Sequence, residues 1–256
     1  MSSNELGMRW KRIILDSLRK RGASGTLKHA VVYFKFLLLQ QWKLYSSWNP
    51  WNPWYCFLDR NFDRRFAVDT AGVLLLPEIH SDSRFNGYSP TPHSLFRRLL
   101  RRVDVDYSQF TFIDFGCGKG KALLLASRLP FRRIVGVEVS SVLIGIAEDN
   151  LKTYRGTRKC ETVQLVRGDA RDFHLPEEKV LCYFWDPFEA DLMQTILKNI
   201  RNSLAAAPRD IYVVCFMPVH RSLFDEVDFL TLVKQASWYC IYRASGGGST
   251  ARAPEL

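Results

Sequence analysis

Short apolar runs alternate with longer amphipathic segments from Thr91 onward. The runs predict strands at 111–115, 133–139, 163–166, 180–185 and 211–216. Helices are expected between them at 92–103, 119–128, 142–154 and 189–204, the first with Thr91 as N-cap and Pro92 in its first turn. Two further runs, 229–233 and 238–242, are too close for a crossover helix and predict a hairpin. The pattern indicates an α/β fold: a doubly wound, seven-stranded, mostly parallel sheet with a terminal antiparallel hairpin.

The N-terminal part of the chain has a different pattern. Leu27–Tyr45 is apolar over a helical length, but Lys28, Lys35 and Lys43 follow one stripe of it. These charges argue against a membrane span, which needs ~20 mainly apolar residues. Two interpretations stay open: a helix packed on the core as a lid, which we favour, or a helix lying in a membrane interface. The following segment, WNPWNPWY at 48–55, is expected to be irregular because of its prolines.

Charge and composition suggest three parts. We expect a basic, Trp-rich helical extension over residues 1–66, a catalytic domain over 67–243 and a disordered tail over 244–256. Residues 1–66 hold 12 Lys/Arg and 4 Asp/Glu, so they carry +8 (12 − 4) of the formal net charge of +10. Such an extension suits an anionic partner (nucleic acid, acidic protein or membrane surface), and equally a solvated face with no dedicated partner.

The most informative stretch is FIDFGCGKGKALLL at 112–125. A strand containing Asp114 runs into a turn with Gly116, Cys117, Gly118 and Gly120, and a helix follows. Glycines allow a tight turn and close backbone approach to a ligand, and the helix N-terminus offers N–H groups. Alone, this turn would also suit a dinucleotide.

Two acidic positions make the pattern more specific. Glu138 ends the second predicted strand, and Asp169-Ala170 follows the third. The glycine turn and both acids therefore fall at the carboxyl edge of the sheet, where open α/β sheets bind ligands. An acid after the second strand can accept hydrogen bonds from both hydroxyls of a ribose.

Together these motifs resemble class I S-adenosylmethionine-dependent methyltransferases, over about residues 91–243. Asp114, Gly116, Gly118 and Gly120 match that family's E/DxGxGxG motif. The resemblance implies S-adenosyl-L-methionine as the cofactor, with its methionine end near the glycine turn that includes Cys117. It further implies that Glu138 holds the ribose and that the adenine lies beside Asp169 and Ala170.

The acceptor side is marked by Asp186, in Phe184-Trp185-Asp186-Pro187-Phe188. This stretch is similar to the D/N-P-P-Y/F motif of methyltransferases that act on amino groups, with one proline missing. Asp186 is the first candidate to orient a nucleophile, with a helix cap as its structural alternative. His220 and Tyr88 are the next catalytic candidates, followed by Tyr183. His220 also fits a loop histidine, and Tyr88 begins a Y-x-P-T-P-like segment that covers the cofactor in similar bacterial enzymes.

Methyl transfer needs binding, alignment and desolvation more than a catalytic triad. The predicted function is S-adenosylmethionine-dependent methylation of an unidentified acceptor, with protein or small molecule favoured, at nitrogen where the resemblance holds. Alternatives are an RNA methyltransferase, or a non-catalytic binding protein that docks through its basic extension. An NAD-dependent oxidoreductase is disfavoured because the turn is GxGxG rather than GxGxxG.

The six cysteines form no CxxC pair and no zinc-like cluster, so neither disulfides nor a metal site are expected. The N-terminus also lacks the apolar centre of a signal peptide. A cytoplasmic location is predicted, with peripheral membrane association as an open alternative.

Overall fold

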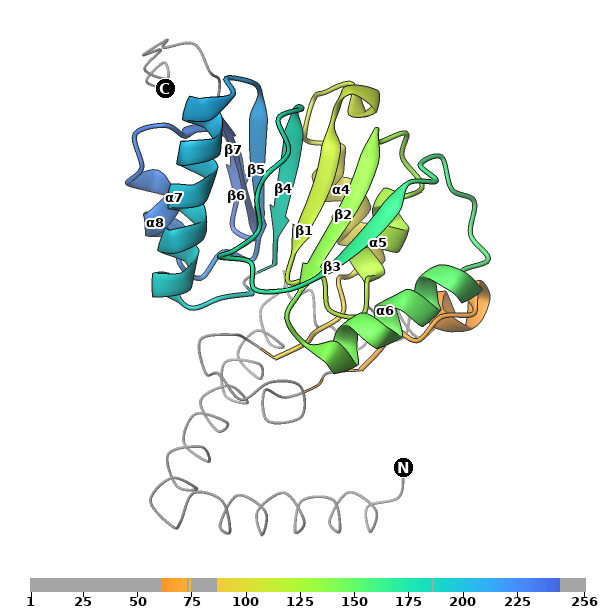
Figure 1. The fold of residues 1–256 in the computed structure, drawn as a ribbon. Helices are drawn as coiled ribbons and strands as arrows, with labels where there is room; N and C mark the ends of the chain where they lie inside the picture. Colours follow the sequence, from red (N-terminus) through yellow and green to blue (C-terminus); the bar gives the residue numbers. More distant parts are fainter. Residues whose placement is uncertain (1–60, 73, 75–86, 186, 245–256) are drawn as a thin grey trace, which may run out of the picture. The chain divides into compact units, whose positions relative to one another are not determined.

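The computed structural model describes residues 61–72, 74, 87–185 and 187–244 (Figure 1). The predictions for Leu27–Tyr45, for the WNPWNPWY segment and for the tail beyond Ala244 lie outside these residues. The chain divides into two compact units, Met1–Tyr55 and Cys56–Leu256, and the second unit carries all the described residues.

The sheet of this unit has seven strands in the order β3-β2-β1-β4-β5-β7-β6. Strands β1 to β5 pair in parallel, and β7 runs antiparallel to both β5 and β6. The predicted mostly parallel sheet with a reversed C-terminal hairpin is therefore confirmed. The strands are β1 (Thr111–Phe115), β2 (Arg133–Glu138), β3 (Val163–Arg167), β4 (Val180–Phe184), β5 (Ile211–Phe216), β6 (Thr231–Ala236) and β7 (Tyr239–Ala244).

Four helices lie close to their predicted positions, and two short helical elements, at 107–109 and 221–225, have no predicted counterpart. They are α4 (His93–Leu100), α5 (Lys121–Ala126), α6 (Ser141–Thr153), α7 (Ala190–Ala206) and the short α8 (Arg221–Asp225), with a 3₁₀ turn η1 (Tyr107–Gln109). The capping role predicted for Thr91 is wrong. Pro92 has an extended ψ of 116° and is itself the N-cap, without a side-chain bond, so Thr91 lies one residue too early to cap.

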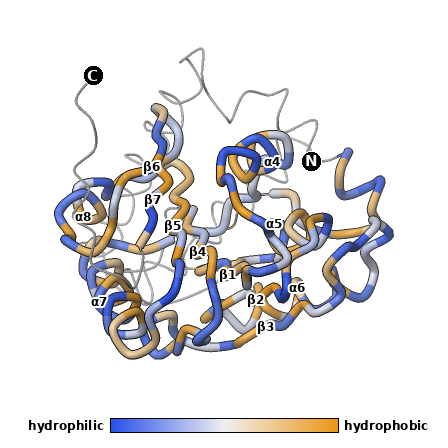
Figure 2. The backbone as a smooth tube through the Cα atoms, turned by 90° about the horizontal axis from the view of Figure 1, so that it is seen from above, coloured by the Kyte–Doolittle hydropathy of each residue, from blue (hydrophilic) through white to orange (hydrophobic). Residues whose placement is uncertain are grey.

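Two hydrophobic cores cover the two faces of the sheet. Residues of α4 and α5 pack with one set of strand side chains, and residues of α7 and α8 pack with the alternate set. Figure 2 shows α4 and α5 on one side of the strands and α7 on the other. The connection between β3 and β4, residues 168–179, contains no helix. It covers the α7 side with Ala170, Phe173 and Leu175.

Helix α5 is buried along its whole length. A helical segment at 61–66 helps to bury helix α5. Phe62, in this segment, is 4% exposed and lies in the same core. The Lys121 ammonium lies 5.1 Å from the centre of the Phe62 ring. Phe66 packs 5.4 Å from Tyr154, just after α6. Residues 61–66 thus pack with the sheet, and the division after Tyr55 precedes the expected boundary at 66/67.

Candidate cofactor and active site

The turn between β1 and α5 has a backbone that requires glycine. Gly116, Gly118 and Gly120 have φ of 77°, 54° and 79°, in the left-handed region that L side chains rarely adopt. A Cβ atom on Gly118 would lie 2.3 Å from the ring of Tyr88, and one on Gly116 would lie 2.7 Å from Cβ of Pro187. The glycine loop, residues 116–120, is therefore closely packed as well as tightly turned.

Glu138 holds this loop from the end of β2. Its side chain is 7% exposed in this unit, and its two oxygens accept from Gly118 N at 2.9 Å and from Ser140 N at 2.8 Å. A carboxylate oxygen can accept more than one hydrogen bond. A buried carboxylate at this edge can accept the hydrogen bonds that the two hydroxyl groups of a ribose donate.

Burial governs the chemistry of Asp114 and Cys117. Burial, and then the nearby charge of Glu138, raises the pKa of Asp114 well above its usual range. Burial likewise raises the pKa of the Cys117 thiol well above its usual value, so the thiol stays protonated at neutral pH. The Cys117 sulfur lies 2.8 Å from the position of a Cβ on Gly136, and the Cys117 amide donates to Val137 O at 3.0 Å. Cys117 therefore supports the loop through packing and backbone.

Asp169 and Ala170 follow β3 as predicted, and the structure adds a partner for the acid. Arg171 Nε lies 3.0 Å from both carboxylate oxygens of Asp169, and the Arg171 amide donates to the same group at 2.9 Å. Asn199, from α7, donates to the Arg171 carbonyl at 2.6 Å. Sequence reasoning missed Arg171, although an arginine two positions after the acid was a usable signal. Ala170 is buried in the core on the α7 side.

The residues predicted for the acceptor side follow strands β4 and β5. Asp186 is outside the described residues. His220 precedes α8, and its Nε2 lies 3.9 Å from Oε2 of Glu189, the N-cap residue of α7. Met217, directly after β5, has a left-handed φ of 50°, and its amide donates to Trp238 O at 2.8 Å. Strained backbone of this kind is concentrated at functional sites.

The two tyrosine candidates are both buried. The Tyr88 hydroxyl donates to Thr70 O at 2.6 Å, and its ring covers Gly118, so the structure places it against the glycine loop. Tyr183, in β4, lies beside Asp114 in the parallel register. Burial raises the pKa of its phenol well above the usual value, which keeps the hydroxyl protonated.

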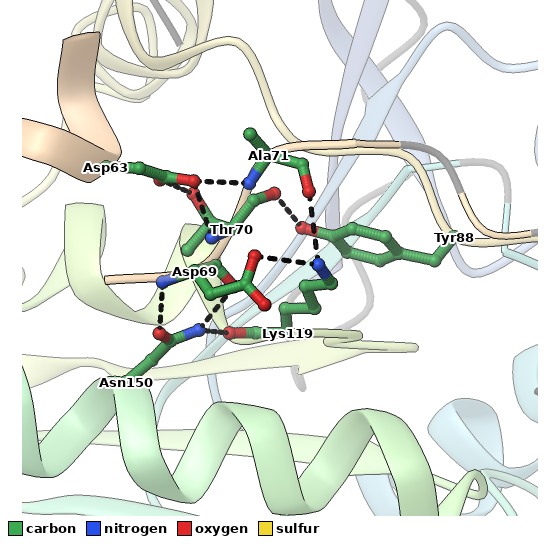
Figure 3. Close-up of polar contacts among 7 residues, drawn as sticks. All are labelled: Asp63, Asp69, Thr70, Ala71, Tyr88, Lys119 and Asn150. Carbon is green, nitrogen blue, oxygen red and sulfur yellow. Dashed lines mark hydrogen bonds and ion pairs between the residues drawn. The ribbon is translucent and has the colours of Figure 1, made fainter. Parts of the chain in front are cut away.

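A segment that sequence reasoning missed contacts the glycine loop from outside the sheet. We call residues 63–71 the strap. The Asp63 carboxylate accepts from the Thr70 amide and hydroxyl and from the Ala71 amide, which closes the strap on itself (Figure 3). Lys119, within the glycine loop, donates to Asp69 Oδ1 at 3.0 Å and to Ala71 O at 3.1 Å. Residues 63–66 fall within the predicted helical extension, and no local signal in the sequence predicts these contacts.

Two kinds of feature are absent from the described residues. No group of three or more His, Cys, Asp or Glu side chains that could hold a metal ion occurs there. No helix in that part of the chain is long and apolar enough to cross a membrane.

Comparison with known proteins agrees with this outline. Residues 112–207 match a family model described as a methyltransferase domain. No curated protein matches the sequence. The matched residues run from the start of β1 to the end of α7, and so include the glycine loop, Glu138 and Asp169.

Solved structures give distant likenesses. An RNA methyltransferase from Salinibacter ruber, in complex with S-adenosyl-L-homocysteine, is 20% identical, with a TM-score of 0.42 over 66% of this chain and 100% of its own. A magnesium protoporphyrin IX methyltransferase from Synechocystis PCC 6803 with bound SAM is 13% identical, with a TM-score of 0.41 over 59% and 76%. A ribosomal protein L11 methylase from Lactobacillus delbrueckii subsp. bulgaricus is 14% identical, with a TM-score of 0.42 over 59% and 77%.

The family match covers the glycine loop and strands β1 to β4 of the seven-stranded sheet, and strands β5 to β7 lie beyond it. By this match, residues 112–207 are similar to a methyltransferase domain.

Proposed function

We propose that S-adenosylmethionine binds at the carboxyl edge of β1, β2 and β3. In this proposal Asp114, Gly116, Cys117, Gly118 and Gly120 form the turn that receives its methionine end. Glu138 holds the ribose, and Asp169 and Ala170 flank the adenine. The observation that carries the proposal is the buried Glu138 carboxylate, bound to the Gly118 amide at 2.9 Å and so facing the loop.

Isothermal titration with S-adenosylhomocysteine tests this assignment. Wild-type protein is expected to bind, and Glu138→Ala is expected to lose more than 100-fold in affinity because a buried acceptor for two hydroxyls is removed. Glu148→Gln, an exposed acid on α6, is the matched control and should bind as wild type. Wild-type affinity in Glu138→Ala, or preferential binding of NAD, would refute the assignment.

The acceptor is expected to approach from the ends of β4 and β5. The cofactor supplies an electrophilic methyl group on a sulfonium. A proton carried by the acceptor would have to leave to a base or to water. His220, with Glu189 at 3.9 Å, lies at the start of α8 where it can take that proton. Asp186 and Tyr88 remain the predicted orienting residues.

We propose nitrogen of a protein or small molecule as the acceptor, with RNA as the alternative. The support is the Asp186-Pro187-Phe188 sequence after β4, in which Phe188 is buried against the core on the α7 side. Incubation with methyl-labelled S-adenosylmethionine and separate protein, small-molecule and RNA fractions of a cell extract distinguishes these classes. Label confined to RNA would overturn the first choice, and no label with intact cofactor binding would favour the non-catalytic alternative.

For location we propose the reducing cytoplasm. Cys117, Cys160, Cys182 and Cys240 are buried free thiols, which is typical of a reducing compartment. Association of the basic residues 1–66 with an anionic partner or a membrane surface is part of the same proposal. Fractionation of cells that express the full chain tests both.

A further inference from the structure

A buried amide side chain joins the strap to the glycine loop. Asn150, on α6, is 3% exposed. Its Oδ1 accepts from Asp69 N at 2.6 Å, and its Nδ2 donates to both Asp69 O and Lys119 O at 2.9 Å. Both backbone groups of a strap residue and one carbonyl of the glycine loop thus meet at one amide (Figure 3).

Lys119 makes a second connection between the same two segments. Its side chain is 7% exposed, and a buried ammonium is stable only when it is paired. The strap supplies that pairing through Asp69 and the Ala71 carbonyl. The ammonium also lies 5.6 Å from the centre of the Tyr88 ring, whose hydroxyl is bound to Thr70 O.

The strap therefore acts on the same stretch of the loop that Glu138 orients. Gly118 donates to Glu138 through its amide, and the next residue, Lys119, is held by Asn150 and Asp69. The Tyr88 ring occupies the position that a Cβ atom on Gly118 would take. A shift of the strap would move the loop relative to Glu138, because close packing and buried hydrogen bonds connect the strap rigidly to the loop.

From this geometry we propose that Asp69 and Asn150 are positioning residues for the cofactor, acting through Lys119, and that strap docking and cofactor binding reinforce each other. The inference rests on the proposed cofactor site, but its failure can be told apart from failure of that site. Coupling of this kind is reciprocal: the factor by which the docked strap raises cofactor affinity equals the factor by which the cofactor favours docking.

The first test is the affinity for S-adenosylhomocysteine in the full chain. Asp69→Asn is expected to weaken binding by about fivefold, at the lower end of typical couplings. Its side chain is 69% exposed, so the change removes the ion pair without opening the core. Lys119→Met should weaken binding at least as much. The double variant should be no weaker than Lys119→Met alone, because the two residues act as a pair.

The control is Asp149→Asn. This residue precedes Asn150 on α6 and forms an exposed pair with Lys152, so affinity should match wild type. Asn150→Asp, which keeps the shape but places an acceptor against two carbonyl oxygens, is expected to weaken binding more than Asp69→Asn. If that variant does not fold, Asp69→Asn and Lys119→Met carry the test.

The second readout is hydrogen exchange, which a purely structural role would not link to the ligand. The amides of Asp69, Thr70 and Ala71 are bonded within this network. Saturating S-adenosylhomocysteine should slow their exchange in wild type by about the same fivefold. If wild type does not bind the ligand, the proposed cofactor site fails and this inference with it. Binding with unchanged exchange, and with wild-type affinity in both Asp69→Asn and Lys119→Met, overturns this inference alone.

Discussion

The residues proposed for the cofactor and those proposed for the acceptor lie at the same edge of the sheet but differ in their hydrogen bonding. On the cofactor side, Gly118 and Lys119 are fixed by Glu138, Asn150 and Asp69 at 2.9–3.0 Å. On the acceptor side, His220 and Glu189 approach to 3.9 Å, beyond hydrogen-bond distance. On the assignments proposed above, the residues assigned to the cofactor are held by hydrogen bonds, whereas the His220–Glu189 pair assigned to the acceptor is not.

The largest expected effect on the cofactor side comes from Gly118→Ala. The new Cβ would lie 2.3 Å from the Tyr88 ring at a φ of 54°, so the loop or the ring must move. Binding of S-adenosylhomocysteine should fall more than 100-fold, as measured by isothermal titration. Gly145→Ala is the control: this glycine is in α6 with open space around it, so the change should leave affinity intact and stabilise the fold by up to ~1 kcal/mol. Unchanged affinity in Gly118→Ala would contradict a fixed loop.

The glycine loop and the strap differ in how well the sequence predicts them. The sheet, the glycine loop and Glu138 follow from local patterns, because strand length, glycine spacing and an acid at a strand end are all readable in short windows. The strap is not predictable in this way, since Asp69 and Asn150 are 81 positions apart and meet only in the folded chain. Charge alone assigns residues 61–66 to the extension, whereas Phe62 packs in the core. Asp186 remains a prediction from its motif.

A smaller effect is expected at the adenine end. Asp169→Asn should weaken S-adenosylhomocysteine binding about tenfold. A neutral acceptor replaces a charged one, and its hydrogen bond to the ligand contributes ~1.5 kcal/mol less to the binding free energy. Part of the effect is offset by Arg171, which already neutralises the acid. Asp172→Asn, exposed and three positions on, serves as the matched control. Equal affinities in the two variants would remove Asp169 from the cofactor site.

On the acceptor side, His220→Asn is expected to leave cofactor affinity within about twofold of wild type, because its contact is with Glu189 rather than the glycine loop. Turnover with the identified acceptor should fall by ~10²-fold if the imidazole takes the acceptor proton. This result would show that cofactor binding and turnover can be changed separately by mutation. A large loss of cofactor affinity in this variant would show that they cannot.

The smallest effect concerns Ala67, within the strap. Ala67 has a left-handed φ of 56°, which costs a residue with a Cβ about 1 kcal/mol. Ala67→Gly should raise the free energy of unfolding by about 0.5 kcal/mol, after the entropic cost of glycine is subtracted. Thermal denaturation with and without S-adenosylhomocysteine measures it. A lowered melting temperature would show that the Ala67 methyl packs better than its backbone angle suggests.

The most direct test of the cofactor assignment is a crystal structure with S-adenosylhomocysteine bound. The two ribose hydroxyls should lie within about 3.2 Å of the Glu138 carboxylate, with the amino-acid end against residues 116–120. A ligand bound elsewhere, or a ribose whose hydroxyls lie away from the Glu138 carboxylate, would contradict the account.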